Sequence, residues 1–296
     1  MTLLLISMPE RAAVWSRVFA DAQEPILLDD ADPEAVTAIA CWTPPDLARF
    51  PNLRAVISVG AGTDHMPPMP EGIVLSRTLA PGIEAMVRDW TVMAALAMHR
   101  DLPVYLDQAS RGEWAGHGAR LARSRRVGIM GMGRIGRLVA QTLSALGFPV
   151  AGWSRSGDPV DGVEVFADRA AFLARTDIAI CLLPLTDQTR GLMDDAFFAA
   201  LPRGARLVHA GRGAQLDMDA LRRALDGGLA FAMLDVTDPE PLPPGHWAWV
   251  DPRVIVTPHV AAVTDAVEGA EHALAVLRAL RSGGPVPGAV DRVRGY

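Results

Sequence analysis

The chain has 296 residues, half of them hydrophobic, which is enough for two domains with a core each. The formal net charge of −6, from 28 basic and 34 acidic residues, argues against a nucleic-acid-binding protein, whose binding face would be basic. Every cation is an arginine, so a Schiff-base lysine and a P-loop lysine are both excluded.

No apolar run approaches the ~20 residues of a membrane span. The first ten residues, MTLLLISMPE, lack the basic region and cleavage site of a signal peptide and are expected to form a first strand. We therefore expect a cytoplasmic protein with neither a membrane nor a nucleic acid as partner.

The two cysteines, Cys41 and Cys181, stand inside apolar runs and are predicted to be buried small hydrophobes. They indicate neither a disulfide framework nor a zinc site. The histidines and acids show no metal-ligand spacing, so no metal is expected.

The first hundred residues alternate short apolar runs with helical or polar segments. Strands are expected at 3–7, 25–28, 38–42, 55–59 and 73–75, and helical segments at 10–20 and 46–50. This alternation predicts an α/β unit with a mostly parallel sheet.

Two of these strands end in loops that could contact a ligand, because ligands bind at the carboxyl ends of strands in open α/β sheets. The backbone N–H groups of Val59, Gly60, Ala61 and Gly62 could hold an anion, although a plain turn is as good an interpretation. Trp42 either lines a substrate pocket or is a core aromatic at a strand end.

A long helix is predicted over 81–100, and it is expected to link two domains with a break near 100–103. The polar segment 107–125, rich in glycine and arginine, is expected to be a connecting region with loose structure. The resulting domains are 1–100 with 270–296, and 101–269.

The most informative motif is RVGIMGMGRIGRLVAQ at 126–141. An apolar run is followed by Gly131, Gly133 and Gly136 in the spacing G-x-G-x-x-G, and then by apolar residues at helical intervals. The first glycine allows a tight turn, the second lets a pyrophosphate approach the backbone, and the third lets the helix pack on the strand. The motif predicts a dinucleotide site that includes Met132, Arg134 and Ile135.

Strands and helices alternate through the rest of the second domain. Strands are expected at 127–130, 149–153, 178–183, 206–209, 232–236 and 254–257; helices are expected at 134–146, 169–175, 194–201, 217–226 and 265–281. Six strands in this pattern predict a doubly wound, Rossmann-type sheet.

The end of the second strand of this domain predicts which nicotinamide cofactor binds. An acid is usual there for the ribose hydroxyls, but the chain has Ser154, Arg155 and Ser156. Since arginine can pair with a 2′-phosphate, NADP(H) is expected in preference to NAD(H). Asp158 and Asp161 lie close by and weigh against this interpretation.

Polar residues at three later strand ends should meet at one edge of the sheet. They supply Arg212, Glu240 and His259, which suit the reduction of a 2-keto acid. The arginine would bind the substrate carboxylate and polarise the keto oxygen, and the histidine would protonate the developing alkoxide. A carboxylate beside the histidine would orient its ring and favour its charged form.

The chain resembles the D-isomer-specific 2-hydroxyacid dehydrogenases over nearly its whole length. The resemblance is carried by VGIMGMGRIG, LLPLTDQTRGL, GRG at 211–213, LDVTDPEPLP and TPHVAAVT, and by WSRS, CWTPP and the ending VDRVRGY.

This resemblance implies a flavodoxin-like substrate domain beside the Rossmann-type domain, a cleft between them, and a homodimer. It implies reduction of glyoxylate and hydroxypyruvate, with Arg212 binding substrate, His259 as general acid and Glu240 supporting it. It also implies that Val59–Gly62 grip the substrate carboxylate. Further cofactor contacts are implied for Leu183, Pro184, Thr186 and Asp235.

Four alternatives stay open. His209 stands where the family often has asparagine, and it is a rival general acid near Arg212. Asp238 competes with Glu240 for the supporting role. The whole protein could also be a cofactor-sensing binding protein, or a dehydrogenase of a larger 2-hydroxy acid.

Overall fold

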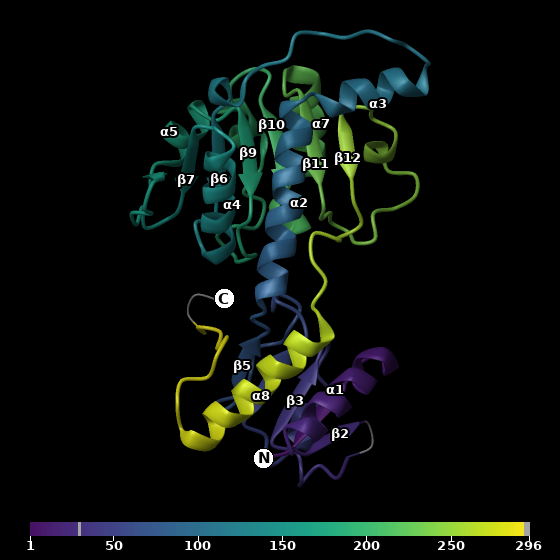
Figure 1. The fold of residues 1–296 in the computed structure, drawn as a ribbon, viewed down its shortest axis with the longest axis vertical. Coiled ribbons are helices and arrows are strands. Elements are labelled where there is room, and N and C mark those ends of the chain that lie inside the picture. The colour runs from purple at the N-terminus through teal and green to yellow at the C-terminus, as the bar shows by residue number, and fades with distance from the viewer. Residues whose placement is uncertain (29–30, 293–296) are drawn as a thin grey trace. The chain divides into compact units, whose positions relative to one another are not determined.

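The computed structural model describes residues 1–28 and 31–292. The chain divides into two compact units, Met1–Ile83 with Val263–Tyr296, and Glu84–Ala262 (Figure 1). Residues 29–30 and 293–296 belong to the predicted substrate domain, and the latter end the VDRVRGY segment; both lie outside the described residues.

The first unit contains a parallel sheet of five strands. They are β1 (Leu3–Ile6), β2 (Ile26–Leu28), β3 (Ala38–Cys41), β4 (Ala55–Ser58) and β5 (Val74–Arg77). Their spatial order is β2-β1-β3-β4-β5, which is the flavodoxin-like order. The predicted strands and the flavodoxin-like fold of this unit are confirmed.

Both faces of this sheet are covered because its strands are apolar on both sides. Leu3 and Leu5 pack with Trp15 and Phe19 of helix α1 (Pro9–Asp21) and with α8 (Ala266–Ser282). Leu4, which points the other way, packs near Phe50 beside the short helix η1 (Leu47–Arg49).

The second unit contains a parallel sheet of seven strands. They are β6 (Val127–Met130), β7 (Val150–Trp153), β8 (Glu164–Phe166), β9 (Ile178–Cys181), β10 (Arg206–His209), β11 (Phe231–Leu234) and β12 (Val254–Val256). The order is β12-β11-β10-β9-β6-β7-β8. The direction of winding reverses between β6 and β9, which is the switch point of a Rossmann-type sheet and the usual place for a dinucleotide.

Helices cover both faces of the second sheet. One core contains residues of α2 (Pro81–His99) and α4 (Arg134–Ala145). The opposite core contains residues of α5 (Arg169–Ala174), α6 (Asp195–Ala199) and α7 (Met218–Gly227). The predicted α/β class with a doubly wound second domain is confirmed.

Three details differ from the sequence prediction. The seventh strand, β8, was not expected, because it is a three-residue strand at the sheet edge without a buried apolar run. Helix α3 (Leu102–Ser110) extends into the segment predicted to be loose, and Pro103 stands in its first turn, where proline is favourable. The short helix η2 (Ala122–Ser124) also lies in that segment.

The unit boundaries also differ from the predicted domain boundaries near residues 100 and 270. Trp90, Ala94 and Met98 of α2 pack in the core of the second sheet, so most of this helix belongs to the second unit. The return to the first unit comes after Ala262, and Ala266 at the start of α8 already packs in the first unit's core. Among the described residues, no helix is both long and apolar enough to cross a bilayer.

Candidate active site

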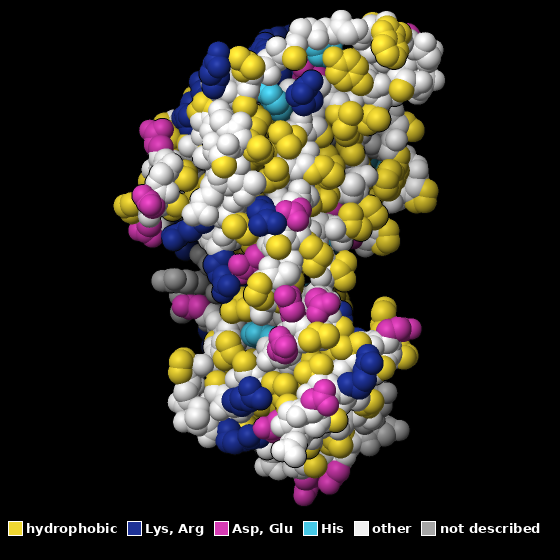
Figure 2. Space-filling model, viewed as in Figure 1, with side chains coloured by type: hydrophobic (Ala, Val, Ile, Leu, Met, Phe, Trp, Pro, Cys, Tyr) yellow, Lys and Arg dark blue, Asp and Glu magenta, His cyan; other side chains and the backbone are white. Residues whose placement is uncertain are grey.

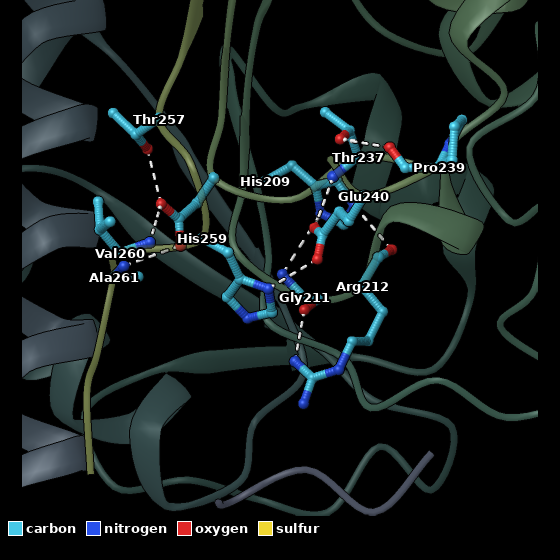
Figure 3. Close-up of polar contacts among 11 residues, drawn as sticks. His209, Gly211, Arg212, Thr237, Pro239, Glu240, Thr257, His259, Val260 and Ala261 are labelled. Atoms are coloured by element: carbon cyan, nitrogen blue, oxygen red, sulfur yellow. Dashed lines mark hydrogen bonds and ion pairs between the residues drawn. The ribbon is translucent and has the colours of Figure 1, made fainter. Parts of the chain in front are cut away.

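Three neighbouring strands of the second sheet bring the predicted catalytic residues together. Since β10, β11 and β12 are adjacent and parallel, the loops that follow them open at the same edge. Arg212 follows β10, Glu240 follows β11 and His259 follows β12. Figure 3 shows their side chains gathered in one region.

His259 and Glu240 form a direct pair. The Nδ1 of His259 lies 2.9 Å from Oε2 of Glu240, and the other carboxylate oxygen accepts a bond from the Thr237 N–H at 3.0 Å. The side chains of His259 and Glu240 are 42% and 38% exposed, so a substrate can reach the ring. With Nδ1 held by the carboxylate, Nε2 is the nitrogen left to exchange a proton with a substrate. Glu240, and not Asp238, is therefore the acid beside the histidine.

Asp235 organises the loop that carries His259. Its carboxylate is buried and accepts hydrogen bonds from Thr257 Oγ1 at 2.6 Å, Val260 N at 2.9 Å and Ala261 N at 2.8 Å. Its backbone carbonyl accepts the His259 N–H at 2.8 Å. These four bonds hold His259 at a φ of 52°, a left-handed conformation that a non-glycine residue adopts only when its surroundings impose it. The expected contact of Asp235 with the cofactor stays a prediction.

Arg212 lies on a tightly packed loop. Its Nη1 donates to the Gly211 carbonyl at 2.8 Å. His209 lies behind this loop with no exposed surface, and burial lowers its pKa to about 4. Gln215, a buried residue that sequence reasoning missed, accepts the Arg212 N–H at 2.8 Å. Nothing in its sequence context distinguishes Gln215 from an exposed loop glutamine.

The glycine-rich turn has the geometry that its spacing predicts. Gly131 has a φ of 102°, and a side chain on Gly136 would place Cβ 1.9 Å from the Gly131 carbonyl oxygen. A Cβ on Gly133, the N-cap of α4, would meet no atom within 4 Å. The first and third glycines are thus needed by the turn and the packing, whereas the second faces open space at a helix N-terminus, where a pyrophosphate would fit.

The remaining residues of this turn have different surroundings. Met132 is buried, and its sulfur lies where a side chain on Gly152 would point. Arg134 pairs with Glu84 at 2.7 Å. Ile135 is partly buried against the core below the turn.

The loop after β7 carries the residues predicted to select NADP(H). Arg155 is exposed and contacts Gln188, which belongs to the loop after β9. Ser154 Oγ accepts the Gly157 N–H at 3.1 Å, and Ser156 Oγ donates to Asp158 at 2.6 Å. The guanidinium of Arg155 therefore lies close to the end of β7. The neighbouring Ser156 is hydrogen-bonded to the carboxylate of Asp158.

The loop after β9 is closed by Thr189, a second residue that sequence reasoning missed. Its Oγ1 accepts the Thr186 N–H at 2.8 Å and donates to the Pro184 carbonyl at 2.7 Å. The carbonyls of Leu183 and Pro184 both accept from the Gln215 amide. These bonds give the segment Leu183–Thr186 a defined shape beside the switch point of the sheet.

In the first unit, the loop after β4 is held by Ser58. Its hydroxyl donates to the Gly62 carbonyl at 2.9 Å and accepts the Gly60 N–H at 3.3 Å. Among the described hydrogen bonds, none is donated by the backbone N–H of Ala61 or Gly62. Val59 is buried in the core below. The loop therefore presents N–H groups that suit an anion.

Trp42 covers this loop and is not a core residue. It is 55% exposed and stacks on His65 with ring centroids 4.0 Å apart. A side chain on Gly60 would place Cβ 2.9 Å from the indole ring. The indole is thus in contact with the loop and also reaches solvent.

Cys41 and Cys181 are buried, as predicted, and burial raises the pKa of each thiol to about 12. Within 1–28 and 31–292 there is no group of three or more His, Cys, Asp or Glu side chains placed to hold a metal ion.

Comparison with known proteins adds independent information. Residues 92–261 match the family model described as "D-isomer specific 2-hydroxyacid dehydrogenase, NAD binding domain". The chain is similar to glyoxylate/hydroxypyruvate reductase A of Serratia proteamaculans, with 37% identity over 269 residues, which is 86% of each chain.

Two solved structures are similar over the whole chain. A D-isomer specific 2-hydroxyacid dehydrogenase of Xanthobacter autotrophicus, in complex with NADPH and MES, has a TM-score of 0.94 at 34% identity and covers 100% of this chain and 99% of its own. An NADPH-dependent glyoxylate/hydroxypyruvate reductase of Sinorhizobium meliloti, in complex with NADP and sulfate, has a TM-score of 0.92 at 35% identity with the same coverage.

Proposed function

Because the chain belongs to the D-isomer-specific 2-hydroxyacid dehydrogenases, we propose that it is an NADPH-dependent reductase of small 2-keto acids. Its expected reactions are glyoxylate to glycolate and hydroxypyruvate to glycerate. The observation that carries the proposal is the 2.9 Å pair of His259 and Glu240 beside the loop of Arg212. The intact pair favours an enzyme over a cofactor-sensing binding protein.

The residues of the Rossmann-type sheet suit NADP(H). When bound, this cofactor supplies a hydride to the keto carbon. The N–H groups at the start of α4 would hold the pyrophosphate beside Gly133, where open space is available. Arg155, with Ser154, would bind the 2′-phosphate, in keeping with the NADP and NADPH present in the two similar structures.

The substrate would be held by charge and by backbone donors. The Arg212 guanidinium would bind the carboxylate and polarise the keto oxygen, as arginine does with its planar set of donors. In the first unit, the N–H groups of Ala61 and Gly62 suit a carboxylate group of the substrate. Trp42, in contact with Gly60, would limit the size of the side chain on the 2-keto acid.

The proton would come from His259. Glu240 accepts the Nδ1–H, so a charged ring carries its second proton on Nε2 and can donate it to the alkoxide oxygen. The resulting neutral ring keeps its orientation because the bond to Glu240 remains. The carboxylate thus orients the ring.

An assay of cofactor oxidation tests the proposal. NADPH and NADH would each be paired with glyoxylate, hydroxypyruvate, pyruvate and 2-ketobutyrate. We expect turnover of glyoxylate or hydroxypyruvate with NADPH and much less with NADH. A preference for NADH would overturn the role of Arg155, and cofactor binding without turnover of any acid would overturn the reductase.

The general acid is tested separately with His259→Asn. This variant should lose about 100-fold or more in kcat, because it removes the proton donor. His246→Asn is the matched control, since His246 is the N-cap of η4 (Trp247–Trp249), which precedes β12, and asparagine is also a good N-cap residue. Equal rates for the wild type and folded His259→Asn would show that another group supplies the proton.

A further inference from the structure

Two fully buried polar side chains lie behind the arginine loop, and the proposed reaction uses neither of them. They are His209, at the end of β10, and Gln215, in the short helix η3 (Gly213–Gln215). We propose that His209 and Gln215 are positioning residues that clamp the backbone of Arg212 and connect it to the loop after β9. This inference rests on the proposed role of Arg212 as the substrate-binding residue.

Both the oxygen and the nitrogen of the Gln215 side-chain amide form hydrogen bonds. Its Oε1 accepts the Arg212 N–H at 2.8 Å and lies 3.7 Å from the Cys181 thiol, which donates to it. Its Nε2 donates to the carbonyls of Leu183 at 3.2 Å and Pro184 at 2.9 Å. Because N–H groups can only face the amide oxygen and carbonyls only the amide nitrogen, the neighbours dictate one orientation of this side chain.

His209 holds the other half of the same peptide segment. Its Nε2 lies 3.0 Å from the Arg212 carbonyl, which can only accept, so Nε2 carries the proton (Figure 3). Its Nδ1 then accepts the Gly211 N–H at 3.5 Å. Burial lowers the pKa of His209 to about 4, so the ring is neutral at pH 7 and its single N–H is engaged. These contacts favour a positioning role over that of a rival general acid.

The clamp leaves Arg212 little backbone freedom. Both its N–H and its C=O are held by side chains, and its Nη1 donates to the Gly211 carbonyl. A Cβ on Gly211 would lie 2.3 Å from the amide oxygen of Gln215. A Cβ on Gly213 would lie 1.9 Å from the Thr237 carbonyl oxygen. Glycine on both sides of Arg212 is therefore required for this packing.

Gln215 also joins two parts of the site. One end of its amide fixes Arg212, and the other fixes Leu183 and Pro184, which lie on the loop proposed to contact the cofactor. A displaced guanidinium would bind the keto acid less well and polarise its oxygen less well. Loss of the clamp should thus raise KM for the keto acid and lower kcat, since small misplacements of binding groups slow catalysis strongly.

The first experiment compares His209→Leu with His209→Gln in the full-length protein. Leucine cannot donate to the Arg212 carbonyl, whereas the glutamine amide can replace Nε2. We expect His209→Leu to lose about ten-fold or more in kcat/KM for glyoxylate, and His209→Gln to recover most of it. The pH dependence of kcat should keep its position in both variants. Thr176→Val is the matched control, because it removes a buried hydrogen bond to Phe172 at the end of α5, outside the three loops of the site.

A double-mutant cycle separates positioning from a general loss of stability. His209→Leu should lower kcat/KM in the wild type and have little further effect in Arg212→Ala, because the bonds of the His209 ring are to the backbone of Gly211 and Arg212. Equal losses in both backgrounds, or losses no larger than those of Thr176→Val, would overturn the clamp. If the wild type itself turned over no keto acid, the proposed function would fail instead.

A measurement on the wild type keeps the inference testable if a variant does not fold. Nitrogen-15 NMR of the histidine rings reports which ring nitrogen carries the proton. We expect a neutral His209 with the proton on Nε2 from pH 7 down to about pH 5, below the ordinary histidine pKa. A charged ring, or a proton on Nδ1, would overturn the assignment.

Discussion

At the scale of single residues, the site depends on buried carboxylates and amides as much as on the groups that would touch substrate. Asp235 is 2% exposed and uses both carboxylate oxygens on the loop of His259. A buried acceptor that is lost leaves unpaired N–H groups behind, and each costs about 1–3 kcal/mol. The left-handed conformation of His259 is therefore stabilised by Asp235, which follows the neighbouring strand β11.

Asp235→Asn should misplace His259 because the amide nitrogen would face a backbone N–H of Val260 or Ala261. We expect kcat with NADPH to fall by about ten-fold or more. Steady-state kinetics on folded protein, checked by circular dichroism, measures this effect. Thr257→Val is the graded control, since it removes one bond to the carboxylate and should cost less. Unchanged kcat in Asp235→Asn would show that the conformation of the His259 loop does not depend on this carboxylate.

At the scale of elements, the turn between β6 and α4 separates glycines that the packing requires from one that is proposed to contact the cofactor. Gly136 is needed because the first turn of α4 crosses the Gly131 carbonyl. Gly133 has ordinary backbone angles, with a φ of −73°, and no described atom lies within 4 Å of the point where its Cβ would be. The motif contains both kinds of glycine, and only the packing around each distinguishes them.

Gly133→Ala should fold normally and bind NADPH more weakly, because its methyl group would enter the space left for the pyrophosphate. Gly136→Ala should instead lower the free energy of unfolding by about 2 kcal/mol or more, since its Cβ would overlap a carbonyl oxygen. Thermal unfolding without cofactor and fluorescence titration with NADPH measure the two effects. Equal stability losses in both variants would contradict this division of roles.

At the scale of the whole molecule, each compact unit contains a buried histidine that is neutral at pH 7. His209 lies in the second unit; in the first, His272 of α8 contacts Ser76 of β5. Burial lowers the pKa of both to about 4. The unfolded chain binds these protons near pH 6.5 and the folded chain only near pH 4, so stability falls as pH falls through that window.

Acid should therefore destabilise both units before the paired carboxylates titrate. Each histidine should remove about 2 kcal/mol of stability between neutral pH and pH 5. The pKa values of acids such as Asp177 and Asp251 lie below their ordinary value of 3.8. The stability that these acids contribute is therefore lost only at a lower pH than that of the histidines. Urea unfolding at pH 7.5 and pH 5 would measure the loss, and His272→Gln should reduce it. An equal stability at both pH values would contradict the neutral buried rings.

The homodimer expected from the family resemblance has a candidate surface on the second unit. Leu106 of α3 is 53% exposed, and Trp114, in the segment that follows, is fully exposed. Figure 2 shows hydrophobic side chains gathered over the region of α3 and β12. Exposed apolar patches on soluble proteins mark interaction sites.

A second copy of the chain is proposed to cover this surface. Light scattering should give a dimer for the wild type and a shift toward monomer for Trp114→Ser with Leu106→Ser. Leu146→Ser is the control, since Leu146 at the end of α4 is 47% exposed in another part of the unit. A monomeric wild type would overturn the proposed dimer surface.

The sequence by itself determined most of the strand and helix order, the doubly wound sheet, the glycine turn and the strand ends that carry Arg212, Glu240 and His259. These features depend on local patterns: apolar runs of strand length, glycines at fixed spacing, and polar residues directly after strands. Parallel strands bring their carboxyl ends to one edge, so the residues after them can be grouped from the order of the strands along the chain.

Only the tertiary structure decided which polar residues support the site. Gln215 and the carboxylate of Asp235 form hydrogen bonds to backbone groups of other loops, and such partners have no fixed spacing in the sequence. The structure also shows that His209 is buried, that Trp42 is exposed, that β8 is a further strand at the sheet edge and that most of α2 belongs to the second unit. Burial and long-range hydrogen bonding depend on how distant segments pack, and a pattern along the chain does not encode that packing locally.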